Sequence, residues 1–245
     1  MTDEEFEEIY ANNKILGNFE MQKEISSNIT RPIKQKDINW YTPKIPVKNQ
    51  GRCGACWAFA ATGLLEYDYF IKKKEIVSLS EQELLDCVPI KYNYGCKGGI
   101  PYYALEFVKD SGINYEKDYP YEKRQRKCQI RLKKAPKLVQ NVQMTPIGET
   151  AIYETLFYSP VIVAVYANSK VWKSYKKGFI TATECGRNRP NHAILILGVV
   201  REGGQRLWYA RNSYGETWGL NGHLKLAMNE NACQIGDTHG FYVTV

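Results

Sequence analysis

The sequence predicts an α+β protein with two lobes, in which helices come first and strands follow. Helical periodicity and helix-start signals occur between Trp40 and Cys128, whereas short β-branched and apolar runs dominate from Pro160 onward. Segregation of helices from an antiparallel sheet is typical of the α+β class. With 245 residues, the chain is long enough for one large domain or for two smaller ones that share an interface.

Residues 1–36 differ from the rest of the chain. They are acidic at the start, contain no cysteine and end in a polar stretch, Ser26–Pro32. We therefore expect an appended segment with an exposed joint, followed by one domain over residues 37–245.

Helices are predicted in the first lobe, which should span about residues 48–145. The longest runs from residue 56 to about residue 72, because apolar residues recur on one side of it. Ser80 followed by Glu83 is a capping-box pattern that opens a second helix. Pro101 suits the first turn of a third helix.

Strands are predicted in the second lobe, which should span about residues 146–245 and include the start of the domain. The runs with strand character are Val161–Tyr166, His192–Val200, Leu207–Asn212, His223–Met228 and Phe241–Val245. Arg201–Gly204 is expected to form a hairpin turn between two of these strands.

Composition argues against several classes of function. The formal net charge of +7 comes from scattered basic residues without an RNA-binding or zinc-finger signature, so we expect no nucleic-acid partner. The chain lacks an apolar run of about 18 residues, and we expect no membrane span. Seven cysteines are consistent with three disulfides and one free thiol in an oxidising compartment.

Chemistry is indicated by Cys56, which lies where the glycine-containing loop that begins at Asn49 turns into a helix. The start of a helix presents unpaired N–H groups and a partial positive charge, which lowers the pKa of a thiol. The resulting thiolate can attack a carbonyl carbon. Cys53 and Cys56 also form a Cys-x-x-Cys pair, which can indicate a redox site or a zinc site. A thioredoxin-like redox site would need a strand before the pair and a parallel sheet after it, whereas the pattern that follows here is helical. A zinc site would need a second closely spaced pair of Cys or His ligands, which the sequence lacks.

The segment around Cys56 resembles the nucleophile segment of the papain and cathepsin family, with Ala55 in place of the usual serine. Asn191–Ala193, which leads into an apolar strand, resembles the region of the family's catalytic histidine. Arg211–Gly215 is similar to its Asn-Ser-Trp-Gly segment. Further matches in the family's order are Gly95–Gly99, Asp118–Tyr121 and Trp218–Gly222. The resemblance covers about residues 38–245.

This resemblance implies a papain-like fold with a mainly helical N-terminal lobe, an antiparallel β-barrel-like C-terminal lobe and an active-site cleft between them. It also implies a cysteine endopeptidase that requires no metal and no organic cofactor. Cys56 would attack the peptide carbonyl, and His192 would hold the ion pair and protonate the leaving amine. Asn212 would orient the imidazole, and Gln50 would donate a hydrogen bond to the oxyanion.

The resemblance also assigns structural cysteines and a binding cleft. The family pattern pairs Cys53 with Cys96, Cys87 with Cys128, and Cys185 with Cys233. The implied substrate-binding residues are Gly98, Gly99, Ile100, Pro101, Ala164, Pro190, Asn191, Trp218 and Thr238. Because the residues assigned to the main specificity pocket are uncharged, we expect a hydrophobic substrate side chain second from the cut.

Residues 1–36 would then be the remnant of an inhibitory pro-segment, because Met1–Phe6 resembles the end of the family's pro-region. Cleavage around Arg31–Asp37 would release the mature enzyme. Expected partners are protein or peptide substrates and cystatin-type inhibitors, and we expect a monomer in a secreted or lysosome- or vacuole-like location.

Tyr214 occupies the position of the family's usual tryptophan after Asn-Ser. We expect the smaller phenol to shield the bond between His192 and Asn212 less well from water. An alternative stays open: a catalytically weak or silent relative that binds peptides or a partner protein.

Overall fold

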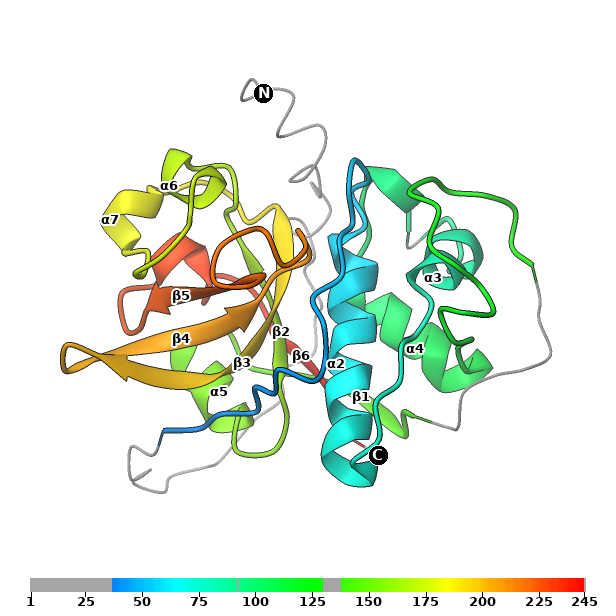
Figure 1. Cartoon of the computed structure of the whole chain (residues 1–245), viewed down its shortest axis with the longest axis horizontal. Coiled ribbons are helices and arrows are strands. Elements are labelled where there is room, and N and C mark those ends of the chain that lie inside the picture. Colours follow the sequence, from blue (N-terminus) through cyan, green and yellow to red (C-terminus); the bar gives the residue numbers. More distant parts are fainter. Residues whose placement is uncertain (1–36, 92, 130–137, 245) are drawn as a thin grey trace.

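The computed structural model describes residues 37–91, 93–129 and 138–244. The predicted pro-segment, residues 1–36, lies outside the described residues. The elements of the first lobe are α2 (Cys56–Lys73), α3 (Glu81–Cys87), the 3₁₀ helix η3 (Gly95–Lys97) and α4 (Pro101–Ser111). Helix α2 stands at the junction of the two lobes in Figure 1, with α3 and α4 on the side away from the sheet.

The predicted helix starts are confirmed, with one difference at α3. The Ser80 hydroxyl accepts a hydrogen bond from Glu83 N at 3.0 Å, which is one half of a capping box. The other half does not form, because Ser80 N donates to Asn114 O at 3.0 Å. The Glu83 carboxylate instead accepts from the Asn114 side chain at 2.9 Å, which ties α3 to the loop after α4.

Among the described residues, the second lobe is built on a six-stranded sheet with the order β1-β6-β2-β3-β4-β5, in which every neighbouring pair is antiparallel. Its strands are β1 (Asn141–Met144), β2 (Val161–Val165), β3 (His192–Glu202), β4 (Gln205–Arg211), β5 (His223–Ala227) and β6 (Phe241–Thr244). Its short helices are α5 (Glu149–Thr155), α6 (Lys170–Lys173), α7 (Ala182–Cys185) and η4 (Ala232–Gln234). The five predicted strands therefore exist, with ends that differ from the prediction by one or two residues.

The long β3–β4 hairpin extends away from α2 (Figure 1). Glu202 pairs with Gln205, so the loop consists only of Gly203 and Gly204. Their φ angles of 58° and 82° are both positive, as a type I′ turn requires, and glycine adopts such angles without steric cost. The predicted turn is confirmed and is tighter than the sequence indicated.

The start of the domain pairs with the sheet of the second lobe. Trp40 N donates to Leu197 O at 2.8 Å, and Val199 N donates to Ile38 O at 2.7 Å. The chain then crosses to the first lobe before α2 begins, so the two lobes are linked by a backbone crossing as well as by packing.

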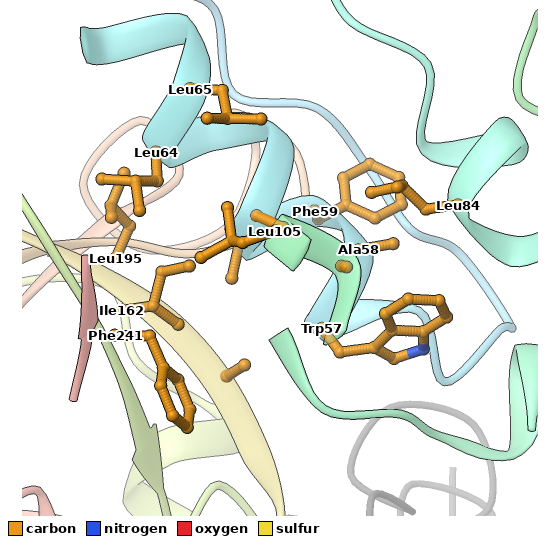
Figure 2. Close-up of a cluster of buried hydrophobic side chains, with 14 of the residues drawn as sticks. Trp57, Ala58, Phe59, Leu64, Leu65, Leu84, Leu105, Ile162, Leu195 and Phe241 are labelled. Atoms are coloured by element: carbon orange, nitrogen blue, oxygen red, sulfur yellow. The ribbon is translucent and has the colours of Figure 1, made fainter. Parts of the chain in front are cut away.

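One hydrophobic core extends across both lobes. Figure 2 shows Leu64 and Leu65 of α2 and Leu105 of α4 in the same cluster as Leu195 and Phe241 of the sheet. A second core lies within the β lobe and includes Trp172 and Trp208, both fully buried. Because the first core is shared, the position of α2 relative to β3 is fixed by close packing.

Candidate active site

Cys56 is the first residue of α2 and is buried. It is the one cysteine of the described chain that is outside a disulfide. The first turn of α2 contains no acidic residue, and the N-cap residue Ala55 forms no side-chain capping hydrogen bond. Cys56 therefore stands at the positive end of the helix dipole.

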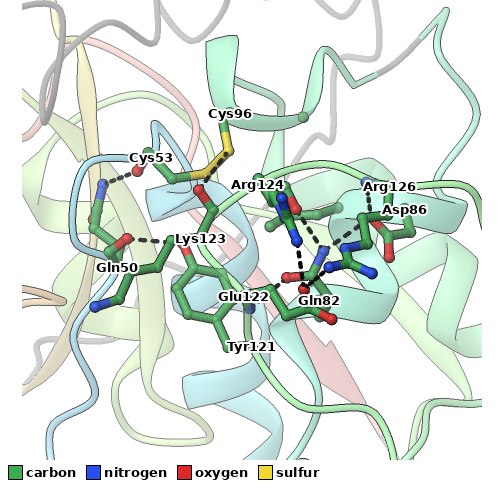
Figure 3. The surroundings of a disulfide bond; sticks show 12 residues. Gln50, Cys53, Gln82, Asp86, Cys96, Tyr121, Glu122, Lys123, Arg124 and Arg126 are labelled. Carbon is green, nitrogen blue, oxygen red and sulfur yellow. Dashed lines mark hydrogen bonds and ion pairs between the residues drawn. A yellow bond between two sulfur atoms is a disulfide. The ribbon is translucent and has the colours of Figure 1, made fainter.

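The loop before Cys56 is held by a disulfide between Cys53 and Cys96 (Figure 3). Gly54 N also donates to Cys96 O at 2.8 Å, so the loop is fixed through backbone as well as sulfur. The Tyr121 hydroxyl donates to Gln50 O at 2.8 Å from the other side of the loop. The approach to α2 is thus anchored at both ends.

Gln50 is fully buried, and both ends of its side-chain amide are engaged. Its Nε2 donates to Cys53 O at 2.9 Å, and its Oε1 accepts from the Ser213 hydroxyl at 2.5 Å. Gln50 N also donates to Ser213 O at 2.8 Å. These bonds fix the orientation of the amide, and the second Nε2 hydrogen is left to donate elsewhere.

Asn212 directly precedes Ser213 and is hydrogen-bonded to His192. His192 Nε2 and Asn212 Oδ1 lie 2.7 Å apart, and Ser213 N donates to the same oxygen at 2.8 Å. Asn212 and Ser213 also share a small void of about 10 Å³ with Phe59 and Ala60 in the first turns of α2. Asn212 therefore contacts the imidazole and also borders the first turns of α2.

Aromatic rings surround the imidazole of His192. The ring centroid of Tyr214 lies 4.9 Å from that of His192, and Trp172 packs edge-on at 6.0 Å. Trp218 contacts the rings of both Tyr214 and Trp172, at 5.4 Å and 5.8 Å. Tyr214 is only 7% exposed, so its ring packs against the imidazole in the interior.

Behind these residues lies a buried cluster of charges that the sequence analysis did not identify. Lys48 Nζ lies 2.7 Å from Glu66 and 2.8 Å from Glu81, and Arg211 Nη1 lies 3.6 Å from Glu66. Burial raises the pKa of Glu81 to about 7, against the opposing effect of Lys48. Burial alone would lower the pKa of Lys48, but the two carboxylates together raise it above its ordinary value.

The predicted substrate-binding residues fall into two sets. Gly98 and Gly99 follow η3, and a Cβ atom at Gly99 would come within 2.6 Å of the Trp57 ring, so only glycine fits there. Ile100 and Ala164 lie in the core cluster that the lobes share, and Pro101 is the first residue of α4.

The second set lines a groove of about 450 Å³ in the β lobe, which is formed partly by the residues that precede His192 in the sequence. Pro190 and Thr238 line this groove, as does a group of polar and charged residues that the sequence analysis missed: Arg187, Asn188, Arg189, Gln234 and Asp237. The signal for the arginines was present, because an Arg-Asn-Arg run stands directly before Pro190 and Asn191.

The three disulfides of the structure are Cys53–Cys96, Cys87–Cys128 and Cys185–Cys233. They are the pairs that the family resemblance implies. In the described ranges, no helix is long and apolar enough to cross a membrane. Within the same residues, no group of three or more His, Cys, Asp or Glu side chains is placed to hold a metal ion.

Comparison with known proteins decides the family. Residues 35–243 match the model of the papain family cysteine protease. The chain belongs to the papain family of cysteine proteases. It is 32% identical to rat (Rattus norvegicus) procathepsin L over 240 residues, which cover 94% of this chain and 71% of that protein.

Other family members are longer than this chain. It is 38% identical to rat Testin-2 and 40% identical to germination-specific cysteine protease 1 of Arabidopsis thaliana. These matches cover 82% and 78% of this chain, but only 62% and 51% of those relatives. The chain therefore spans between half and two thirds of the length of these two relatives.

Solved structures show the same fold. A cysteine protease of Carica candamarcensis, CMS1MS2, in complex with E-64 is 34% identical, with a TM-score of 0.75 over 85% of this chain and 97% of that one. The proform of the ragweed pollen allergen Amb a 11, a cysteine protease, is 28% identical and has a TM-score of 0.87 over 100% of this chain and 71% of that one. The predicted papain-like α+β fold is thereby confirmed.

Proposed function

We propose that this chain is a cysteine endopeptidase that hydrolyses peptide bonds in proteins through Cys56, His192, Asn212 and Gln50. The observation that carries the proposal is the 2.7 Å contact between His192 and Asn212, which is tied through Ser213 and Gln50 to the loop that leads into Cys56. The nucleophile belongs to one lobe and the imidazole to the other, and these hydrogen bonds connect the imidazole to the loop that precedes Cys56.

In the first step, the Cys56 thiolate attacks the carbonyl carbon of the substrate, and the carbonyl oxygen takes up the negative charge. The free Nε2 hydrogen of Gln50 and the backbone N–H of Cys56 donate to this oxygen. Each such donor is worth about 3 kcal/mol in comparable sites. Because Ser213 and Cys53 already fix the Gln50 amide, this donor needs no reorganisation during the reaction.

In the second step, the tetrahedral intermediate collapses and the C–N bond breaks. Nε2 of His192 is bonded to Asn212, so the proton that goes to the leaving amine comes from Nδ1. An acyl-enzyme on Cys56 remains. Water then attacks this thioester, gives up a proton to Nδ1, and releases the acid and the thiolate.

Several details belong to the same proposal. An apolar side chain second from the cut would bind along Ile100, Ala164 and Pro190. The eight residues between Cys87 and Cys96 leave little room for an insertion that would block one end of the cleft, which favours an endopeptidase. Trp218 would line the leaving-group side. Residues 1–36 would act as a pro-segment, and cystatin-type proteins as inhibitors.

A secreted or lysosome- or vacuole-like location is also proposed. Three disulfides are typical of proteins that fold in oxidising compartments, and this is the observation that supports the secretory pathway.

The test is hydrolysis of a fluorogenic dipeptide with Leu second from the cut, under mild reductant and after removal of residues 1–36. We expect turnover by the natural sequence and none by Cys56→Ala, while Gln50→Ala should lower kcat by about 10²- to 10³-fold. Labelling by an epoxide peptide should require Cys56. A well-folded protein that shows neither turnover nor labelling would instead establish a silent relative.

A further inference from the structure

The groove lined by Arg187, Arg189, Pro190, Asp237 and Thr238 has a rigid frame; we call it the arginine groove. The Cys185–Cys233 disulfide joins the two chain segments that form it. The Gln234 side chain, which is 4% exposed, bonds to the facing segment at both ends of its amide: Nε2 donates to Gly186 O at 2.9 Å, and Oε1 accepts from Asn188 N at 3.3 Å. The groove is therefore a preformed feature.

Its charges are unbalanced. Arg187 and Arg189 are exposed, and neither guanidinium forms an ion pair within the described chain. The single carboxylate, Asp237, already accepts a hydrogen bond from Asn231 Nδ2 at 2.6 Å. The Thr238 hydroxyl is buried and has no hydrogen-bond partner among the described residues. Two exposed cations thus share the groove with a single carboxylate.

The arginine groove is held in register with the proposed active site. Asn191 N donates to Val165 O at 2.9 Å, and the Asn191 side chain accepts from Ala167 N at 2.9 Å. These bonds fix the backbone between Pro190 and His192. The groove therefore begins at Pro190, two residues before the imidazole on the same fixed backbone.

We propose that the arginine groove makes the enzyme accept an acidic residue second from the cut, in addition to apolar residues. This inference rests on the proposed function. Glutamate combines the two properties that the site offers: its methylene groups pack on Pro190, and its carboxylate reaches Arg187 or Arg189. The arginine guanidinium binds a carboxylate through two parallel hydrogen bonds. The positive charges of Arg187 and Arg189 would also repel a lysine at the second position of the substrate.

The test compares peptide substrates that differ only at the second position, which is Glu, Gln, Leu or Lys. Glutamine has the shape of glutamate without the charge, so the ratio of kcat/KM for Glu over Gln isolates the contribution of the carboxylate. An exposed ion pair of this kind is worth up to about fivefold in that ratio. We expect the ratio to fall toward one in the double variant Arg187→Gln, Arg189→Gln, and also at high salt, which screens exposed charges.

The matched control is Lys176→Gln with Lys177→Gln, which removes the same charge from exposed positions of the β lobe that do not line the groove. It should keep both the Glu/Gln ratio and the rate. A second variant, Arg189→Glu, should raise the kcat/KM ratio of Lys over Gln.

The outcomes are separable. Cleavage of the Leu peptide together with a Glu/Gln ratio that the double variant does not change would overturn the groove and leave the protease standing. A kcat/KM ratio of Lys over Gln above one in the natural sequence would mean that Asp237 determines the charge preference of the groove. That result would also overturn the proposed preference for an acidic residue. Failure to cleave any of the peptides would remove the proposed function, and the groove with it.

Discussion

Replacing His223 by phenylalanine should make the fold less sensitive to acid. His223 is the first residue of β5, is 3% exposed, and stacks on Tyr209 with ring centroids 5.3 Å apart. Its Nδ1 bonds to Asn221 O at 2.9 Å, whereas its Nε2 is buried without a hydrogen-bond partner in the described structure. A proton added at Nε2 would therefore place an unsolvated charge in the interior.

Burial lowers the pKa of His223 from 6.5 to about 4, and the nearby Arg211 acts in the same direction. The Asn221 and Leu220 backbone and the Glu216 carboxylate act the opposite way. Between these two pKa values the unfolded chain binds more protons than the folded one, so stability falls as the pH drops. The full loss, complete below about pH 4, corresponds to about 3 kcal/mol.

The assay is urea unfolding at about pH 7.5 and about pH 4.5 in a Cys56→Ala background, which prevents self-digestion. His223 should account for about 2.5 kcal/mol of the difference between the two free energies of unfolding. His223→Phe keeps the stacked ring and removes the titration, so its two values should lie closer together by that amount. His239→Phe is the control and should keep the wild-type difference, because His223 is still present. Equal pH dependence in His223→Phe and wild type would refute the reasoning.

Further predictions concern the charge cluster, a disulfide and the aromatic ring beside His192. Lys48→Met leaves Glu66 and Glu81 buried without this lysine and should lower the free energy of unfolding, measured in urea, by about 3–5 kcal/mol. The control Lys177→Met, at an exposed site, should change that free energy little. Equal effects of the two variants would contradict a stabilising role for the buried ion pairs of Lys48. Joint replacement of Cys185 and Cys233 by alanine should lower the free energy of unfolding by about 2–4 kcal/mol in the same urea assay. A smaller loss would mean that the hydrogen bonds of Gln234 hold the arginine groove without the disulfide. Tyr214→Trp should raise kcat by about twofold, because the larger indole shields the 2.7 Å bond between His192 and Asn212 from water; an unchanged kcat would reject this role.

The start of α2 and the strands of the sheet could be predicted because their signals are local. A glycine-containing loop followed by an apolar helical face locates Cys56, and runs of β-branched residues locate β2 and β3 to within two residues. Helices α6 and α7 were not predicted, because four residues are too few to show a helical period. Strand β1 was missed for a similar reason: it has four residues, and its sequence, NVQM, has little strand character.

The charges inside the molecule could not be predicted from the sequence. Lysine, arginine and glutamate are ordinarily exposed, so sequence patterns place them on the surface. Glu66 faces the interior only because Lys48 and Arg211, which lie far away in the chain, come to it in the folded structure. Arg187 and Arg189 presented the opposite difficulty: they are exposed as expected, and only the fold shows that they share a groove with Asp237.

The buried cluster lies where the proposed catalytic residues of both lobes are connected to the fold. Lys48 stands two residues before Gln50, and Arg211 directly precedes Asn212. Glu66, which both cations approach, belongs to the helix that begins at Cys56. Breaking a buried ion pair on one side is costly, so the three segments cannot move apart independently. The buried hydrogen bonds of the site set the orientation of each group, and the charges beside them act together with the shared core to hold the lobes in place.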